Sequence, residues 1–267
     1  MRRVVAWLLL AVLVVLVVEG YLAVTAEYLP SDPGYTIDTT VGPPGGEPGG
    51  EPVNLVVLGD STVAGVGSPS LEESLPVLVA ERVAERLHRP VHVIGFGVSG
   101  ARTATVLENQ VPMLAELDPD ASTASRPGSA APAAGPDVVL IVIGGNDVTH
   151  VTPPWAMRRQ TAALIEGARE VSGAPVVIGG IPQFRTVPAL LQPLRWAVGR
   201  YANVLREAQR GAARAAGAPY VDIAALASPR FIGKPESMSS DGFHPAPLGY
   251  SFWADALAPA VANALTP

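Results

Sequence analysis

The sequence contains no cysteine, which excludes disulfides, thiol nucleophiles, thiolate metal sites and a lipid anchor on cysteine. Basic side chains are also scarce, because Lys234 is the only lysine and no basic block follows the first residues. Nucleic-acid binding needs a basic face that neutralises phosphates, so a net charge of -6 argues against it. The four histidines form no HExxH pattern, and we expect neither a catalytic metal nor a cofactor.

Residues 1–27 are a hydrophobic export segment rather than part of the fold. Arg2 and Arg3 precede an apolar run that reaches Val24 with Glu19 as its one charge, and this pattern is typical of a signal peptide or a signal anchor. Small residues around Ala26 would permit cleavage there, whereas the length of the run suits a membrane span. We favour a retained anchor in the cell membrane, with secretion after cleavage as the alternative. Both interpretations place the rest of the chain outside the cytoplasm.

Residues 28–52 are rich in proline and glycine and are expected to form an extended, poorly ordered linker. The remainder, 53–267, is long enough for one α/β domain. An Ala, Ser, Pro and Gly-rich stretch at 118–135 is predicted to be a surface insertion.

Short apolar runs alternate with amphipathic segments through residues 53–267. Predicted strands cover 53–58, 91–94, 138–143, 176–178 and 220–223. Four-residue periodicity predicts the helices between them, including one through Leu107, Val111 and Leu114 that bends at Pro112. The alternation predicts a mainly parallel five-stranded sheet with helices on both faces, preceded by an N-terminal hydrophobic helix.

Reactive side chains follow the ends of the predicted strands. Ser61 follows the first strand, Gly100 the second and Asn146 the third, while Asp241 and His244 precede the last helix. Each segment taken alone is also compatible with an ordinary turn or helix start. The carboxyl ends of parallel strands meet at one edge of a sheet, where ligands bind in α/β folds, so we expect these residues to converge.

This set of residues suits nucleophilic attack on an acyl bond. Asp241 and His244 are three residues apart, so the carboxylate can orient an imidazole that takes a proton from Ser61. The backbone N–H groups of Ser61 and Gly100 and the side-chain amide of Asn146 are candidate donors to an oxyanion.

Four sequence blocks resemble those of the SGNH (GDSL-type) hydrolases, a family of serine esterases and lipases. They are Gly59-Asp60-Ser61, Gly97-Val98-Ser99-Gly100, Gly144-Gly145-Asn146-Asp147 and Asp241-Gly242-Phe243-His244-Pro245. The similarity extends from about Val53 to Leu265. It implies a flavodoxin-like three-layer α/β/α sandwich in which Ser61 is the nucleophile, His244 the general base and Asp241 its orienting partner. Gly100 and Asn146 would complete the oxyanion hole.

Neighbouring residues are expected to have supporting roles. Asp60 and Asp147 would brace their turns by hydrogen bonds, and His88 and His92 would be structural. His150 could line the pocket, although a surface position is favoured. Thr62 stands where the family often has leucine.

The resemblance implies an exported esterase that forms an acyl-enzyme. Its substrate would be a small-molecule, lipid or glycan acyl ester, and the loop at 182–193, with Phe184, Pro188, Leu190 and Leu191, would form part of the acyl-pocket rim. The same site could instead transfer acyl groups to cell-envelope glycans or lipids. Phosphate binding by the loop after the first strand is disfavoured, because no Gly-Lys-Ser/Thr or G-x-G-x-x-G motif is present there. The sequence leaves the oligomeric state open.

Overall fold

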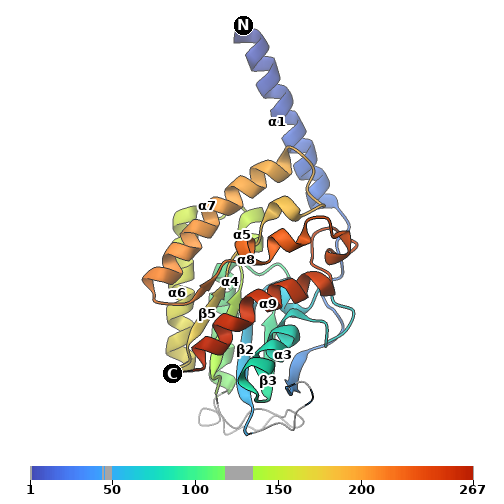
Figure 1. Ribbon diagram of the computed structural model, residues 1–267. Helices are drawn as coiled ribbons and strands as arrows, with labels where there is room; N and C mark the ends of the chain where they lie inside the picture. The colour runs from blue at the N-terminus through green and yellow to red at the C-terminus, as the bar shows by residue number, and fades with distance from the viewer. Residues whose placement is uncertain (1, 44, 46–49, 118–134, 267) are drawn as a thin grey trace.

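The strands form one mixed sheet, which lies behind the helices at the front of the view in Figure 1. The computed structural model describes residues 2–43, 45, 50–117 and 135–266. Within these ranges the sheet has six strands in the order β1-β3-β2-β4-β5-β6. They are β1 (Ile37–Val41), β2 (Val53–Gly59), β3 (Val91–Gly97), β4 (Val138–Val142), β5 (Val176–Gly179) and β6 (Tyr220–Val221). Strands β2 to β6 pair in parallel, as predicted, whereas β1 is antiparallel to β3.

The prediction of five strands was wrong, because β1 lies inside the stretch predicted to be a linker. Ile37 pairs with Gly95 and is buried, and the Asp38 carboxylate lies 2.8 Å from Nε2 of the buried His92. Five residues rich in β-branched side chains suffice for an edge strand. The prolines and glycines around these five residues dominate the composition of 28–52, and for that reason the sequence did not predict the strand. The insertion expected at 118–135 lies, apart from Gly135, outside the described residues.

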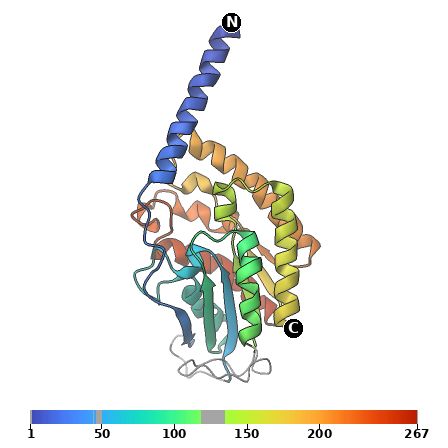
Figure 2. The ribbon, with the colours of Figure 1, turned by 180° about the vertical axis from the view of Figure 1, so that it is seen from behind.

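Helices cover both faces of the sheet, which confirms the predicted three-layer α/β/α arrangement (Figures 1 and 2). These helices include α3 (Leu75–Leu87), α4 (Thr103–Asn109), α6 (Pro154–Ser172), α7 (Leu194–Ala215) and α9 (Pro247–Ala264). Side chains alternate along β2: Leu55 and Val57 pack toward α3 and α9, whereas Val56 and Leu58 pack toward α4 and α6. Both faces of β2 are therefore buried, in agreement with its unbroken apolar sequence.

Short helical turns gather mainly beyond the carboxyl ends of the strands. They are α2 (Ser61–Ala64), α5 (Gly145–Thr149), α8 (Ile223–Leu226) and the 3-10 turns at Val111–Leu117, Phe184–Thr186, Ser228–Phe231 and Pro235–Ser237. The single bent helix predicted through Leu107 and Leu114 was wrong, since α4 ends at Asn109 and a 3-10 turn follows it. Pro112 lies in the first turn of that 3-10 segment, where its missing N–H costs least.

The N-terminal helix α1 (Arg2–Thr25) projects from the body of the protein (Figures 1 and 2). It is long and apolar enough to cross a membrane, a property that it shares with signal sequences. Most of its large apolar side chains are exposed, including Trp7 and Val17. Its last turns meet the body beside the start of α7, at the end of the molecule where the strands terminate.

Candidate active site

Ser61 lies at the first position of α2, directly after the buried strand β2. Asp60 caps this turn: its Oδ1 accepts hydrogen bonds from the Thr62 backbone N–H at 3.0 Å and from the Thr62 hydroxyl at 2.8 Å. The threonine at this position therefore adds a side-chain hydrogen bond that leucine could not make. Burial raises the pKa of Asp60, although both Thr62 bonds oppose this effect.

The structure brings Ser61, His244 and Asp241 into one hydrogen-bonded chain. His244 Nε2 lies 3.0 Å from Ser61 Oγ, and His244 Nδ1 lies 2.6 Å from Asp241 Oδ2. Ser61 and His244 are each 8% exposed, so water reaches the pair only from the cavity side. An imidazole between a hydroxyl and a carboxylate can accept the hydroxyl proton and remain oriented as it becomes charged.

Asp241 is surrounded by donors. Its Oδ1 accepts the backbone N–H groups of Phe243 at 2.8 Å and His244 at 3.0 Å, and its Oδ2 also accepts that of Leu29 at 3.3 Å. Burial raises the pKa of Asp241, but the hydrogen bonds from the His244 side chain and these backbone groups outweigh it and hold the pKa at about 2. Asp241 is therefore an anion at neutral pH.

Gly100 and Asn146 face the same cavity as Ser61 and His244. Gly100 has a φ of +81°, a conformation that favours glycine. One N–H of the Asn146 amide donates to the Ala101 carbonyl at 3.0 Å, which ties the turn after β4 to the turn after β3. The second N–H of the same amide is available to a ligand oxygen.

Asp147 strengthens the link between these two turns. Its Oδ2 accepts the backbone N–H and the hydroxyl of Thr103, each at 2.9 Å, and its Oδ1 accepts the Thr152 hydroxyl at 3.0 Å. The side chain is 1% exposed. Asp147 thus holds Asn146 beside the segment that follows Gly100.

Sequence reasoning missed Gln110, which binds the backbone two residues before Ser61. Its Oε1 accepts the Gly59 N–H at 2.9 Å, and its Nε2 donates to the Gly59 carbonyl at 2.7 Å. Because Gln110 is buried, this pair fixes the last residue of β2. A glutamine on an apolar helical pattern was the only signal, and it did not indicate the partner.

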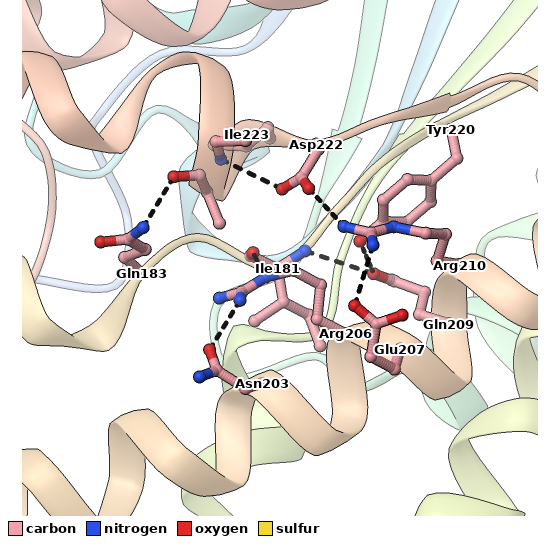
Figure 3. Close-up of polar contacts among 12 residues, drawn as sticks. Ile181, Gln183, Asn203, Arg206, Glu207, Gln209, Arg210, Tyr220, Asp222 and Ile223 are labelled. Carbon is pink, nitrogen blue, oxygen red and sulfur yellow. Dashed lines mark hydrogen bonds and ion pairs between the residues drawn. The ribbon is translucent and has the colours of Figure 1, made fainter.

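A second polar network supports the site from α7 (Figure 3). Gln209 is fully buried, and its amide accepts the Ile181 N–H at 3.2 Å and donates to the Ile143 carbonyl at 2.9 Å. Arg206 donates to the carbonyls of Ile181 and Pro182, each at 2.9 Å. Ile143 directly precedes the turn that carries Asn146, and Ile181 lies in the loop after β5. Because Gln209 bonds both residues, α7 fixes the position of this turn relative to that loop.

Two cavities meet at Ser61, Asn146, Phe243 and His244. The inner cavity, of about 70 Å³, lies above β4 and β5, and Phe184 and Trp253 are among its lining residues. The outer cavity, of about 780 Å³, lies between the end of α1 and the start of α7. An ester carbonyl beside Ser61 would therefore have separate space on its two sides.

The loop residues predicted to form the pocket rim are divided between these cavities. Phe184 lines the inner cavity and Leu190 the outer one, whereas Leu191 is 51% exposed. Pro188 lies beside the Gly242 backbone. His150 lines the outer cavity with an exposed side chain. Across the described part of the chain, no cluster of three or more metal-ligating side chains is present.

Comparison with known proteins identifies relatives that cover most of the chain. Residues 57–252 match the model of the GDSL-like Lipase/Acylhydrolase family. A GDSL-like esterase of Mycobacterium tuberculosis is 32% identical over 215 residues, which are 80% of this chain and 63% of that protein. The chain thus spans less than two thirds of this relative. An arylesterase of Vibrio mimicus is 30% identical over 193 residues, which are 72% of this chain and 80% of that protein.

The fold is also similar to solved structures. The lipase/acylhydrolase from Enterococcus faecalis superposes with a TM-score of 0.58 at 20% identity, covering 80% of this chain and 98% of that one. At this level of identity the similarity concerns the fold.

The pKa of Asp241 leads to an acid-stability prediction. The pKa of Asp241 is about 2 in the folded protein, below the ordinary value of 3.8. The ionised carboxylate therefore contributes its full stabilisation above pH ~4, and this contribution is lost as the pH falls toward 2. We expect the free energy of unfolding to fall less over this range in Asp241→Asn than in the wild type, as measured by urea denaturation between pH 5 and 2.5. The exposed Asp32, changed to Asn, serves as the control and should follow the wild type. Parallel curves for the wild type and Asp241→Asn would contradict the assignment.

Proposed function

The chain belongs to the GDSL-like lipase/acylhydrolase family of ester-hydrolysing enzymes, and we propose that it is an exported serine hydrolase that cleaves carboxylic esters through an acyl-enzyme. The resemblance to the SGNH hydrolases expected from the four sequence blocks is confirmed. The observation that carries the mechanistic proposal is the chain of hydrogen bonds from Ser61 through His244 to Asp241.

In the first step the Ser61 Oγ attacks the ester carbonyl carbon, and His244 Nε2 takes the hydroxyl proton. The ionised Asp241 stabilises the imidazolium and keeps the proton-accepting nitrogen directed at Ser61. The backbone N–H groups of Ser61 and Gly100 and the free amide N–H of Asn146 donate to the oxygen that becomes negative. Collapse of this intermediate breaks the ester C–O bond, and His244 returns the proton to the departing alcohol.

In the second step water attacks the acyl group on Ser61. His244 takes one proton from this water, and the bond between the carbonyl carbon and Ser61 Oγ then breaks. The carboxylic acid leaves and the serine regains its proton. The two cavities that meet at Ser61 provide room for the acyl and alcohol portions on opposite sides of the carbonyl.

Export rests on the N-terminal segment. Arg2 and Arg3 begin α1 and precede its apolar run, an order that leaves the N-terminus inside and carries the rest of the chain across the membrane. We propose that α1 is retained as an anchor.

Acyl transfer is the alternative for the same site. The outer cavity is large enough for an acceptor alcohol to replace water in the second step. Product analysis with an acyl ester, with and without a carbohydrate acceptor, separates the two reactions. Free acid in both mixtures supports hydrolysis, whereas acylated carbohydrate as the main product supports transfer.

The role of Ser61 predicts covalent labelling. A fluorophosphonate should label the wild type and not Ser61→Ala, and the variant should lose about 10³-fold or more in kcat, because the attacking oxygen is absent. The matched control is Ser70→Ala, a serine nine residues away that faces neither cavity near Ser61. In-gel fluorescence and p-nitrophenyl acetate hydrolysis measure the two effects. Equal labelling of Ser61→Ala and wild type would disprove the assignment.

The role of Asn146 predicts a loss confined mainly to the chemical step. Asn146→Ala should lower kcat by about 10²- to 10³-fold with KM changed only a few-fold, because the amide stabilises charge that develops in the transition state. Steady-state kinetics with p-nitrophenyl acetate measure both constants. The exposed Asn263, changed to Ala, is the control and should leave them unchanged. A rise in KM at constant kcat would instead indicate ground-state binding.

A further inference from the structure

The outer cavity has one wall that belongs to the N-terminal helix. Ala23 and Val24 of α1 face it from one side, Leu194 and Val198 of α7 from another, and Ser61 lies within it. A flexible tether alone would not line the catalytic cavity.

Specific contacts dock this end of α1 on the body. The Glu19 carboxylate accepts the Leu194 N–H at the start of α7 at 2.7 Å, and Glu19 is 8% exposed. After the helix, the Tyr28 hydroxyl donates to the Ala23 carbonyl at 2.6 Å, and the Tyr28 ring packs edge-on against Phe243 with centroids 5.3 Å apart. Phe243 in turn packs against His244. A continuous series of contacts thus joins the helix end to the catalytic histidine.

If α1 is retained as an anchor, as proposed above, its length would place the docked end at a bilayer surface. Its 24 residues extend about 36 Å at 1.5 Å per residue, more than the ~30 Å of a hydrocarbon core. Glu19 is the one acidic residue of the helix and would be costly deep in lipid. In an anchored chain with Glu19 paired to α7, the last turns of α1 and the cavity beside them would lie in the interfacial layer.

Exposed apolar side chains occur among the residues that line the outer cavity and at positions next to them in the sequence. Leu191 is 51% exposed and Trp196, in the first turn of α7, is 64% exposed. Val151, which lines the cavity, is 66% exposed and has a φ of +53°, a strained conformation for a β-branched residue. Exposed tryptophan and aliphatic side chains are typical of surfaces that contact the interfacial layer of a membrane.

We propose that the outer cavity receives the apolar chain of a membrane amphiphile, an acyl ester that enters from the bilayer between α1 and α7. The proposal rests on the proposed esterase function and names its substrate class. The alternative, a water-soluble ester or acetylated glycan, would enter the cavity directly from water.

The test uses the full-length chain in phosphatidylcholine vesicles and two esters, p-nitrophenyl palmitate dissolved in the vesicles and water-soluble p-nitrophenyl acetate. The measured quantity is the ratio of kcat/KM for palmitate to that for acetate. Ala23→Phe fills the cavity from α1, and this ratio should fall about tenfold or more. Ala11→Phe places the same change at an exposed position of the same helix and should leave both rates unchanged.

A second pair of variants tests the exposed apolar residues Leu191 and Trp196, here called the rim, without filling the cavity. Combined Leu191→Ser and Trp196→Ser should raise the apparent KM for vesicle-bound palmitate about tenfold, because less apolar surface contacts the bilayer. Leu226→Ser, a control on an exposed leucine that lines a different surface cavity, should not change it. This pair decides the question if Ala23→Phe fails to fold.

An unchanged ratio in Ala23→Phe together with an unchanged KM in the rim variant would overturn the proposal. Equal losses in the rim variant and Leu226→Ser would also overturn it. Failure of the esterase function gives a different result, since neither ester would then be cleaved faster by the wild type than by Ser61→Ala.

Discussion

The site depends on two close backbone approaches, of β2 to β4 and of β3 to the α2 turn that carries Ser61. A Cβ atom at Gly59 would lie 2.2 Å from the Val142 carbonyl oxygen of β4, and one at Gly97 would lie 2.0 Å from the Ala64 N of α2. Side chains at either position would separate the strands from the turn that carries Ser61. Two glycines therefore allow β2, β3 and β4 to deliver their following turns to one small region.

Buried polar side chains then hold the strand ends and the turns that follow them in place. Gln110 holds the Gly59 backbone, Asp147 joins the turns after β3 and β4, and Gln209 joins the ends of β4 and β5. Each satisfies buried backbone groups that would otherwise be costly to leave unpaired. Such hydrogen-bonded networks limit the movement of the candidate catalytic side chains, and the proposed oxyanion stabilisation requires preorganised donors.

The N-terminal segment is continuous with the site in space although it is distant in sequence. Leu29 donates to Asp241, and Tyr28 packs on Phe243 beside His244. The segment between the apolar helix and β1 thus contributes to the surroundings of the carboxylate that orients the imidazole. The N-terminal segment, the outer cavity and the candidate site at Ser61 therefore form one structural unit.

The sequence by itself determined the parallel sheet, the layered fold and the candidate residues Ser61, Gly100, Asn146, Asp241 and His244, because buried strands and strand-end turns leave local patterns. Only the tertiary structure decided which distant partners meet. The edge strand β1 needed β3 to pair with, Gln110 needed the end of β2, and the docking of Glu19 on α7 needed both helices in place. Such contacts depend on long-range packing, which leaves no periodic signal along the chain. For the same reason the sequence indicated a nucleophile, whereas the cavity beside α1 emerged only from the folded chain.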